Sequence, residues 1–135
     1  MYNNPWNYNG ANFTSDMIDN FTGFVYLIIN NKTGKKYIGK KLFFRSGYRQ
    51  VNKKRKKVRI ESDWKKYYGS NPILKEEAKA AKEDFNRIIL RLCRNKTEMS
   101  YYELEHQILH NALLSDEFYN EYIHVRVNVK HLIGD

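Results

Sequence analysis

Residues 24–39 contain the pattern that most restricts how this chain can fold. The run FVYLII is rich in β-branched and aromatic side chains, which are typical of a buried strand. The letters NNKTG that follow favour a tight turn, and KKYIG then fits a returning strand. The sequence therefore predicts a β-hairpin that carries one tyrosine on each arm, Tyr26 and Tyr37.

The register of this hairpin decides whether the two phenols meet. If Tyr26 pairs directly with Tyr37, both side chains share one face, with their Cβ atoms ~4.5–5.5 Å apart. If the register shifts by one residue, Tyr37 pairs with Leu27 and the phenols separate. The sequence does not choose between these registers, and an ordinary cross-strand aromatic pair is an alternative to a functional one.

Downstream of the hairpin, the pattern predicts two helices and one strand. Residues 73–83 are rich in Ala, Lys and Glu and should form a short helix. Residues 85–93 alternate apolar and polar side chains as a strand does. Caps between residues 95 and 100 favour a helix that runs to about Leu114. We expect an α/β (α+β) fold, with helices beside a small three-stranded, mostly antiparallel sheet.

The length of 135 residues fits one domain. We interpret residues 1–22 as an irregular arm, 23–124 as the domain and 125–135 as a tail. The single cysteine, Cys93, excludes an internal disulfide. No apolar run approaches the ~20 residues of a membrane helix, and the N-terminus lacks the features of a secretory signal. We therefore expect a cytoplasmic protein with no membrane partner.

Positive charge is concentrated between residues 40 and 66. This segment holds twelve Lys or Arg side chains and two acidic ones, whereas the whole chain has a net charge of +9. Such a patch favours a polyanionic partner, although a solvated basic loop is the alternative. We interpret 40–66 as a basic segment that binds a polyanion; if that polyanion is DNA, the candidate contacts are Lys40, Arg49, Lys53, Lys54, Arg55, Lys56 and Lys57.

Five fragments of the sequence, in this order, resemble the GIY-YIG nuclease family, and in particular the homing endonucleases of tailed phages. FVY and YIG stand eleven positions apart in the places of GIY and YIG. YYGSNPILKEEAKAAKEDFNRIILRLC, ELEHQIL and FYN resemble the later motifs of the family. The resemblance extends over about residues 23–124.

The resemblance implies a metal-dependent endonuclease that hydrolyses phosphodiester bonds of double-stranded DNA, in the host cytoplasm if a phage encodes it. It implies that Tyr26 acts as the base and that Tyr37 supports or orients the water. Nearby cations lower the pKa of a phenol, so Lys40 and Lys41 could polarise either tyrosine. The implied cofactor is Mg²⁺ (or Mn²⁺), held by a glutamate. A homodimer is one way for so short a chain to gain specificity.

Two acids compete for the metal-ligand role, Glu103 and Glu105. On a helical wheel, Glu105 falls inside an apolar stripe and Glu103 falls on the opposite side. A carboxylate in an apolar face needs a partner, and a metal ion is one. The spacing of the family motif also selects Glu105, and Glu103 remains the alternative. The stripe consists of Ile108, Leu109, Ala112 and Leu113.

The phosphate-binding arginine is where this chain departs from the family pattern. The resemblance implies an arginine on a helix about ten residues after the second tyrosine, where this chain has Gly47. Arg45 and Arg49 flank that position, and we favour Arg45. Asn120 is a candidate to bind phosphate or to cap a helix. The departure supports one alternative, a non-catalytic nucleic-acid-binding domain on the same scaffold. A structure-specific repair or recombination nuclease is a further alternative that the sequence leaves open.

Overall fold

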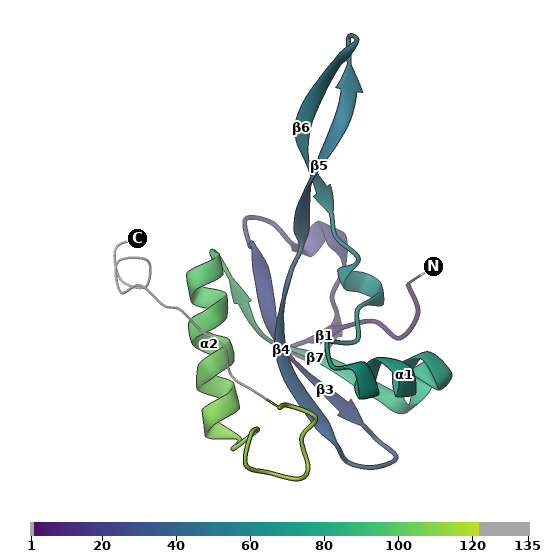
Figure 1. Cartoon of the computed structure of the whole chain (residues 1–135), viewed down its shortest axis with the longest axis vertical. Helices are drawn as coiled ribbons and strands as arrows, with labels where there is room; N and C mark the ends of the chain where they lie inside the picture. Colours follow the sequence, from purple (N-terminus) through teal and green to yellow (C-terminus); the bar gives the residue numbers. More distant parts are fainter. Residues whose placement is uncertain (1, 122–135) are drawn as a thin grey trace.

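The structure, a computed structural model, describes residues 2–121 and is built on one mixed sheet (Figure 1). The strand order in this sheet is β2-β1-β7-β3-β4, and β5 and β6 form a separate two-stranded sheet. The strands are β1 (Asn7–Tyr8), β2 (Ala11–Asn12), β3 (Gly23–Asn30), β4 (Lys36–Leu42), β5 (Phe44–Val51), β6 (Lys54–Glu61) and β7 (Phe85–Cys93). The α-helices are α1 (Pro72–Ala80) and α2 (Lys96–Leu109), and the short 3₁₀ helices span Ser15–Met17, Trp64–Lys66 and Lys82–Asp84.

The predicted hairpin consists of β3 and β4, and its register differs from both alternatives. Tyr26 lies opposite Gly39, and Ile28 lies opposite Tyr37. This register is shifted by two residues from direct pairing of the tyrosines. Because a shift of two preserves the face, the phenols form a diagonal pair on one side of the sheet, with ring centroids 6.1 Å apart.

Alternation along β3 divides the core between the two faces of the sheet. Phe24, Tyr26 and Ile28 enter an aromatic cluster that includes Trp6 and Trp64. The residues between them face the other way, where Val25 packs with Ile38, Cys93 and Met99. Helix α2 covers this second face, while Leu74 of α1 belongs to the aromatic cluster. Both faces of β3 are therefore buried, which explains its continuous apolar sequence.

The prediction of an irregular N-terminal arm and a three-stranded sheet is wrong in detail. Residues 7–8 form β1, which pairs parallel to β7, and β1 pairs with β2. The sheet therefore has five strands. Strands of two residues are too short to show a period, so no pattern in the sequence predicts them. Trp6, which precedes β1, is fully buried in the core.

Arg87 on β7 connects this arm to the rest of the fold. Its buried guanidinium lies over the rings of Trp6 and Tyr68, at 4.7 and 4.3 Å from their centroids. It donates hydrogen bonds to the carbonyl oxygens of Asn4 and Tyr67. Burial lowers the pKa of Arg87. Carbonyl dipoles and π-faces thus solvate this cation in place of a carboxylate.

The downstream elements agree in type with the prediction, but the second helix is shorter. The predicted helix at 73–83 corresponds to α1, which ends at Ala80 and is followed by the 3₁₀ helix Lys82–Asp84, and the predicted strand at 85–93 coincides with β7. Helix α2 ends at Leu109 instead of near Leu114. The tail at 125–135 lies outside the described residues. Within residues 2–121, no helix is both long and apolar enough to cross a bilayer.

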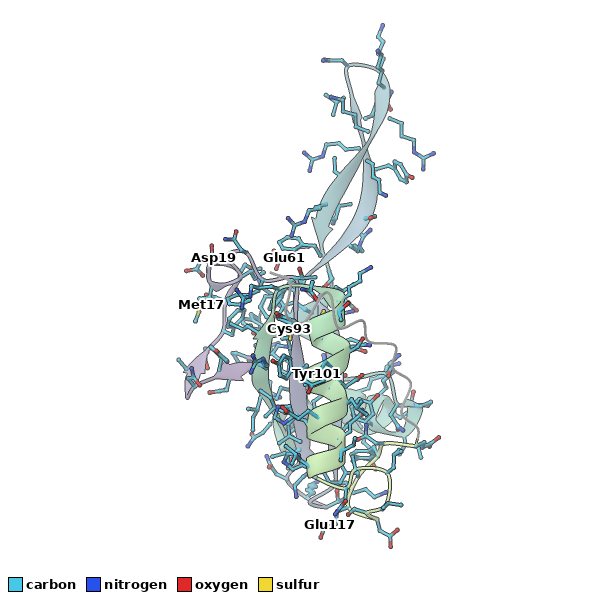
Figure 2. The ribbon with its side chains drawn as sticks, turned by 90° about the vertical axis from the view of Figure 1, so that its left-hand side faces the viewer. Met17, Asp19, Glu61, Cys93, Tyr101 and Glu117 are labelled. Carbon is cyan, nitrogen blue, oxygen red and sulfur yellow. The ribbon has the colours of Figure 1, made fainter. Side chains whose placement is uncertain are left out.

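The basic segment folds as a twisted hairpin, β5–β6, that projects from the body of the protein (Figure 1). Its turn consists of Asn52 and Lys53, with φ angles of 51° and 62°. Two consecutive positive φ angles are typical of the type I′ turn, whose twist matches that of the two strands. Side chains extend from both sides of this hairpin into solvent (Figure 2).

We predict that Arg87→Met lowers the free energy of unfolding by about 3 kcal/mol, because it removes a buried cation that donates to several partly buried carbonyl oxygens. Urea denaturation measures this loss. Arg91→Met on the same strand is the control, since Arg91 is exposed and should cost less than about 1 kcal/mol. Equal losses in the two variants would contradict the anchoring role of Arg87.

Candidate active site

A cavity of about 500 Å³ lies along the outer edge of β4, the last strand of the sheet. Residues from both faces of the sheet, from the N-terminus of α1 and from the segment after α2 meet there. The lining residues are Tyr26, Tyr37, Gly39, Lys40, Ser70, Asn71, Pro72, Glu103, Gln107, Asn120 and Glu121. Both tyrosines of the predicted pair line this cavity.

Gly39 makes room for the hydroxyl of Tyr26. A Cβ atom at position 39 would overlap the Tyr26 hydroxyl and lie 2.6 Å from its Cζ. The same atom would lie 3.0 Å from the ring of Tyr37. The glycine of the YIG motif therefore lets the Tyr26 ring cross over strand β4 towards the cavity.

Tyr37 is held in place by the loop that precedes α1. Its hydroxyl lies 2.8 Å from Oγ of Ser70. Gly69, next to Ser70, has a φ of +87°, and a Cβ there would lie 3.2 Å from the ring of Tyr37. A glycine at this position thus allows both the turn of the loop and its close approach to the phenol.

Tyr26 is a neutral phenol in this environment. Burial raises its pKa well above the ordinary value, and Tyr67, Tyr37 and the charge of Glu103 raise it further. We expected neighbouring cations to lower this pKa, and that expectation is wrong for the structure described. Lys41 contacts Asp63, with Nζ 2.7 Å from Oδ1, and lies over the ring of Tyr67.

Glu103 and Lys40 form the charged part of the cavity. Nζ of Lys40 lies 3.7 Å from the Glu103 carboxylate and donates a hydrogen bond of 2.8 Å to Ser100. The Glu103 side chain is 16% exposed. Burial raises the pKa of its carboxyl group, while Lys40 opposes that rise. A carboxylate so poorly solvated favours an additional cation beside it.

The structure places Glu103, not Glu105, in the cavity. Glu105 is exposed, and so are Ile108 and Leu109 of the apolar stripe that favoured it. The buried side of α2 carries Met99 and Gln107 instead. The preference for Glu105 assumed that the apolar stripe packs on the sheet, and this assumption is wrong for residues 108 and 109.

Asn120 and Gln107 bind the outer edge of β4 at one residue. Asn120 accepts a hydrogen bond of 3.1 Å from the amide of Ile38 and donates one of 2.8 Å to its carbonyl oxygen. Gln107 donates to the same oxygen at 3.1 Å. The side chain of Asn120 therefore acts as a neighbouring strand would, and its polar atoms are engaged by the backbone instead of facing a phosphate.

The arginines considered for phosphate binding lie outside the cavity. Arg45 and Arg49 are exposed side chains of β5, in the projecting hairpin. Gly47 lies between them, where a Cβ would collide with the side chain of Ile60 on β6. Of the residues that the structure describes, Lys40 is the single cation that lines the cavity. The candidate contacts Lys53, Lys54, Arg55, Lys56 and Lys57 all lie at or near the tip of the hairpin.

The oxygen donors of the cavity fit a hard divalent cation. Within residues 2–121, no three His, Cys, Asp or Glu side chains gather closely enough to hold a metal on their own. Glu103 and the exposed Glu121 are the acids that line the cavity. Mg²⁺ is commonly held by one or two carboxylates, with water and substrate oxygens as its other ligands.

Sequence reasoning missed Gln107 and Ser70. Gln107 follows Glu103 by four residues, so both occupy one face of α2. Two polar residues at this spacing could have indicated that Glu103, not Glu105, faces the cavity. Ser70 gave no comparable signal, because its contact with Tyr37 depends on the path of a loop.

We predict that Asn120→Leu destabilises the fold by about 2 kcal/mol, because the Ile38 amide loses its acceptor inside the protein. Urea denaturation measures the loss, and hydrogen exchange should show faster exchange at Ile38. Asn86→Leu is the control and should change stability little, because Asn86 on β7 is exposed. An unchanged exchange rate at Ile38 would show that this contact is not formed.

We predict that Lys40→Met raises the pKa of Glu103, because Lys40 now opposes the effect of burial. Carboxyl ¹³C chemical shifts followed against pH measure this value directly. Lys41→Met is the matched control: it should raise the pKa of Asp63, which Lys41 lowers, and leave Glu103 unchanged. A Glu103 pKa that falls or stays constant in Lys40→Met would contradict the pairing.

Comparison with known proteins agrees with this arrangement. A family model described as "Putative endonuclease segE, GIY-YIG domain" matches residues 6–123, which is most of the chain. No curated protein and no solved structure matches the chain. The match begins at Trp6, so it includes the arm that completes the sheet as well as the two tyrosines and Glu103. This chain belongs to the segE family of GIY-YIG endonuclease domains.

Proposed function

We propose that this protein is a metal-dependent endonuclease that hydrolyses phosphodiester bonds of DNA in the cavity at the edge of β4. The observation that carries the proposal is the convergence of Tyr26, Tyr37, Lys40 and Glu103 on this one cavity. Membership of a family of endonuclease domains supports the same reaction. The basic hairpin adds the positive charge that a polyanionic substrate requires.

Glu103 is the proposed metal ligand. Its carboxylate is the less exposed of the two acids in the cavity, and its partial burial makes a further cation favourable. A bound Mg²⁺ or Mn²⁺ would neutralise charge on the phosphate and lower the pKa of a coordinated water. Glu121 at the rim is a second oxygen donor within the same cavity.

Lys40 provides the fixed positive charge for the phosphate. Its ammonium already has Ser100 and Glu103 as partners, which hold it beside the cavity. The N-terminus of α1 adds to this charge, since Ser70, Asn71 and Pro72 line the cavity and the helix dipole is positive at that end. These groups would oppose the negative charge that develops on phosphorus oxygens during attack by water.

Tyr26 and Tyr37 would position the attacking water or a phosphate oxygen. Because its pKa is raised, Tyr26 keeps its proton at neutral pH and acts as a hydrogen-bond donor, not as a resident base. The hydroxyl of Tyr37, placed by Ser70, supplies a second polar group. Holding water and phosphate in one geometry lowers the entropic part of the barrier.

The proposed type of endonuclease rests on the sequence resemblance to homing endonucleases of tailed phages. We propose the homing type on double-stranded DNA, with the host cytoplasm as its place of action. A homodimer stays a prediction.

A non-catalytic DNA-binding domain is the second candidate, and one observation favours it. Among the described residues, no arginine lines the cavity, and Lys40 alone contributes a cationic side chain there. An ammonium binds phosphate as a point charge and lacks the bidentate geometry of a guanidinium. If Lys40 and a metal do not compensate for this, the domain would bind DNA without cutting it.

We predict that the wild-type protein nicks supercoiled plasmid DNA in the presence of Mg²⁺ and that EDTA abolishes this nicking. Glu103→Gln should reduce the nicking rate by at least ~100-fold, because it removes the charged metal ligand while keeping the side chain's shape. Glu105→Gln is the matched control two residues away and should nick at nearly the wild-type rate, since Glu105 is exposed.

The outcomes separate the candidates. Loss of nicking in Glu105→Gln but not in Glu103→Gln would contradict the proposed site. Plasmid binding without nicking in any divalent metal would favour the non-catalytic domain. Band-shift measurements at the same salt concentration show that the variants still bind DNA, and thermal unfolding shows that they are folded.

A further inference from the structure

The β5–β6 hairpin has the dimensions of an element that enters a DNA groove. Each strand has eight residues. At ~3.4 Å per residue, the hairpin extends roughly 24 Å from its root to its turn. The major groove of B-form DNA admits a two-stranded β-ribbon of this kind. The hairpin stands clear of the sheet and helices (Figure 1), so a duplex could reach both of its faces.

The root of the hairpin is fixed to the strand that lines the active-site cavity. Only Phe43 separates β4 from β5, and its side chain is fully buried. The amide of Phe43 donates to Thr22, and Ser62 donates to the carbonyl oxygens of Leu42 and Phe43. The hairpin therefore leaves the body in one direction relative to Lys40 and Glu103.

The acidic residue at this root has partners of its own. Glu61 ends β6 at the root of the hairpin (Figure 2). Its carboxylate accepts hydrogen bonds from Ser15 and from the indole of Trp64, both at 2.7 Å. Its charge is thus tied to the body. The rest of the hairpin, from Phe44 to Ile60, contains basic and no acidic side chains.

The two faces of the hairpin differ in how their arginines are held. Arg55 lies over the ring of Tyr48, with Cζ 4.3 Å from the centroid. Arg59 lies over the ring of Phe44 at 4.1 Å. Strand alternation and register put both pairs on one face, which we call the stacked face. It consists of Phe44, Ser46, Tyr48, Gln50, Arg55, Lys57 and Arg59, with Glu61 opposite Phe44 at its root.

The opposite face carries cations without such stacking. Arg45 pairs with Ile60, and Arg49 lies opposite Lys56. Among the described contacts, no aromatic ring lies against either arginine of this face. Exposed cations without ring contacts suit phosphates, which are bound by charge with little demand on geometry.

A second hollow lies next to the active-site cavity and extends to Leu42, close to the root of the hairpin. It has a volume of about 420 Å³ and shares Lys40 with that cavity. Leu42 at the root of the hairpin and Lys96 of α2 also line it. A DNA backbone that leaves the active site would meet these lysines before it reaches the hairpin.

We propose that the hairpin lies in the major groove beside the cut site with its stacked face towards the base edges, where Arg55 and Arg59 read guanines. This inference rests on the proposed function, because it takes duplex DNA as the substrate. An arginine held on a ring loses less side-chain entropy on binding, and its planar fork matches the O6 and N7 atoms of guanine. The hairpin is thus the sequence-reading element of the nuclease.

The geometry also sets distances along the DNA. Arg55 and Arg59 are four residues apart, or roughly 13 Å at ~3.3 Å per residue, which corresponds to about four base pairs at 3.4 Å each. The full hairpin spans about seven base pairs by the same estimate. The bases that are read should therefore lie within about one helical turn of the cut, on one side of it.

The test is selection of bound DNA from a library of duplexes with 30 random base pairs, carried out in EDTA so that metal-dependent cutting is absent. Wild-type protein should enrich two guanine-containing positions about four base pairs apart. Arg55→Lys and Arg59→Lys keep the charge but remove the fork, so each should lose about tenfold preference at one position. Arg49→Lys on the opposite face is the matched control and should retain both preferences.

Three results would overturn the proposal: no enriched bases with wild-type protein, unchanged preferences in both stacked-face variants, or equal loss in Arg49→Lys. Thermal unfolding confirms that each exposed substitution leaves the fold intact. The proposed nuclease activity fails separately, because plasmid nicking depends on Glu103 and the selection needs no cutting. Base preference without nicking would thus support the hairpin inference while refuting the catalytic proposal.

Discussion

The candidate site depends on how the free edge of β4 is bound at Ile38. An edge strand exposes amides and carbonyls that invite pairing with other chains. Here Asn120 occupies both groups of Ile38, and Gln107 adds a second donor to the carbonyl oxygen. On the same edge, the backbone of Lys36 bonds to residues 117 and 119. The segment after α2 thereby replaces a sixth strand and closes one end of the cavity.

This binding of the edge also fixes the rotation of α2. Gln107 reaches Ile38 from the buried side of the helix, so Glu103, one turn earlier, must face the same strand. There it meets Lys40, two residues beyond Ile38 on β4. A carboxylate and an ammonium are thus brought together by hydrogen bonds to a backbone that carries neither charge. The position of the Lys40–Glu103 ion pair therefore follows from the hydrogen bond between Gln107 and Ile38.

The sequence predicted the elements with strong periods and missed those set by tertiary contact. FVYLII and FNRIILRLC were recognised as strands because their side chains report burial directly. The arm gave no such signal, since β1 has two residues and depends on Arg87 for its position. The expected position of Glu105 on the packed face was wrong for a related reason: the apolar stripe of α2 does not follow the face that packs, where Gln107 is buried.

The hairpin explains why Gly47 stands where the family pattern implies an arginine. The family pattern implies a helix at that position, but here it lies in β5 beside Ile60, where a larger side chain would collide. The chain therefore carries its arginines outward, to a ribbon that begins one residue after β4 ends. Cation density is low at the cavity and high along the groove-sized hairpin. Because most cations lie on the hairpin, binding to DNA depends less on the active site. The cavity itself has little positive charge, and the proposed chemistry therefore needs a metal ion at Glu103 in place of the missing guanidinium.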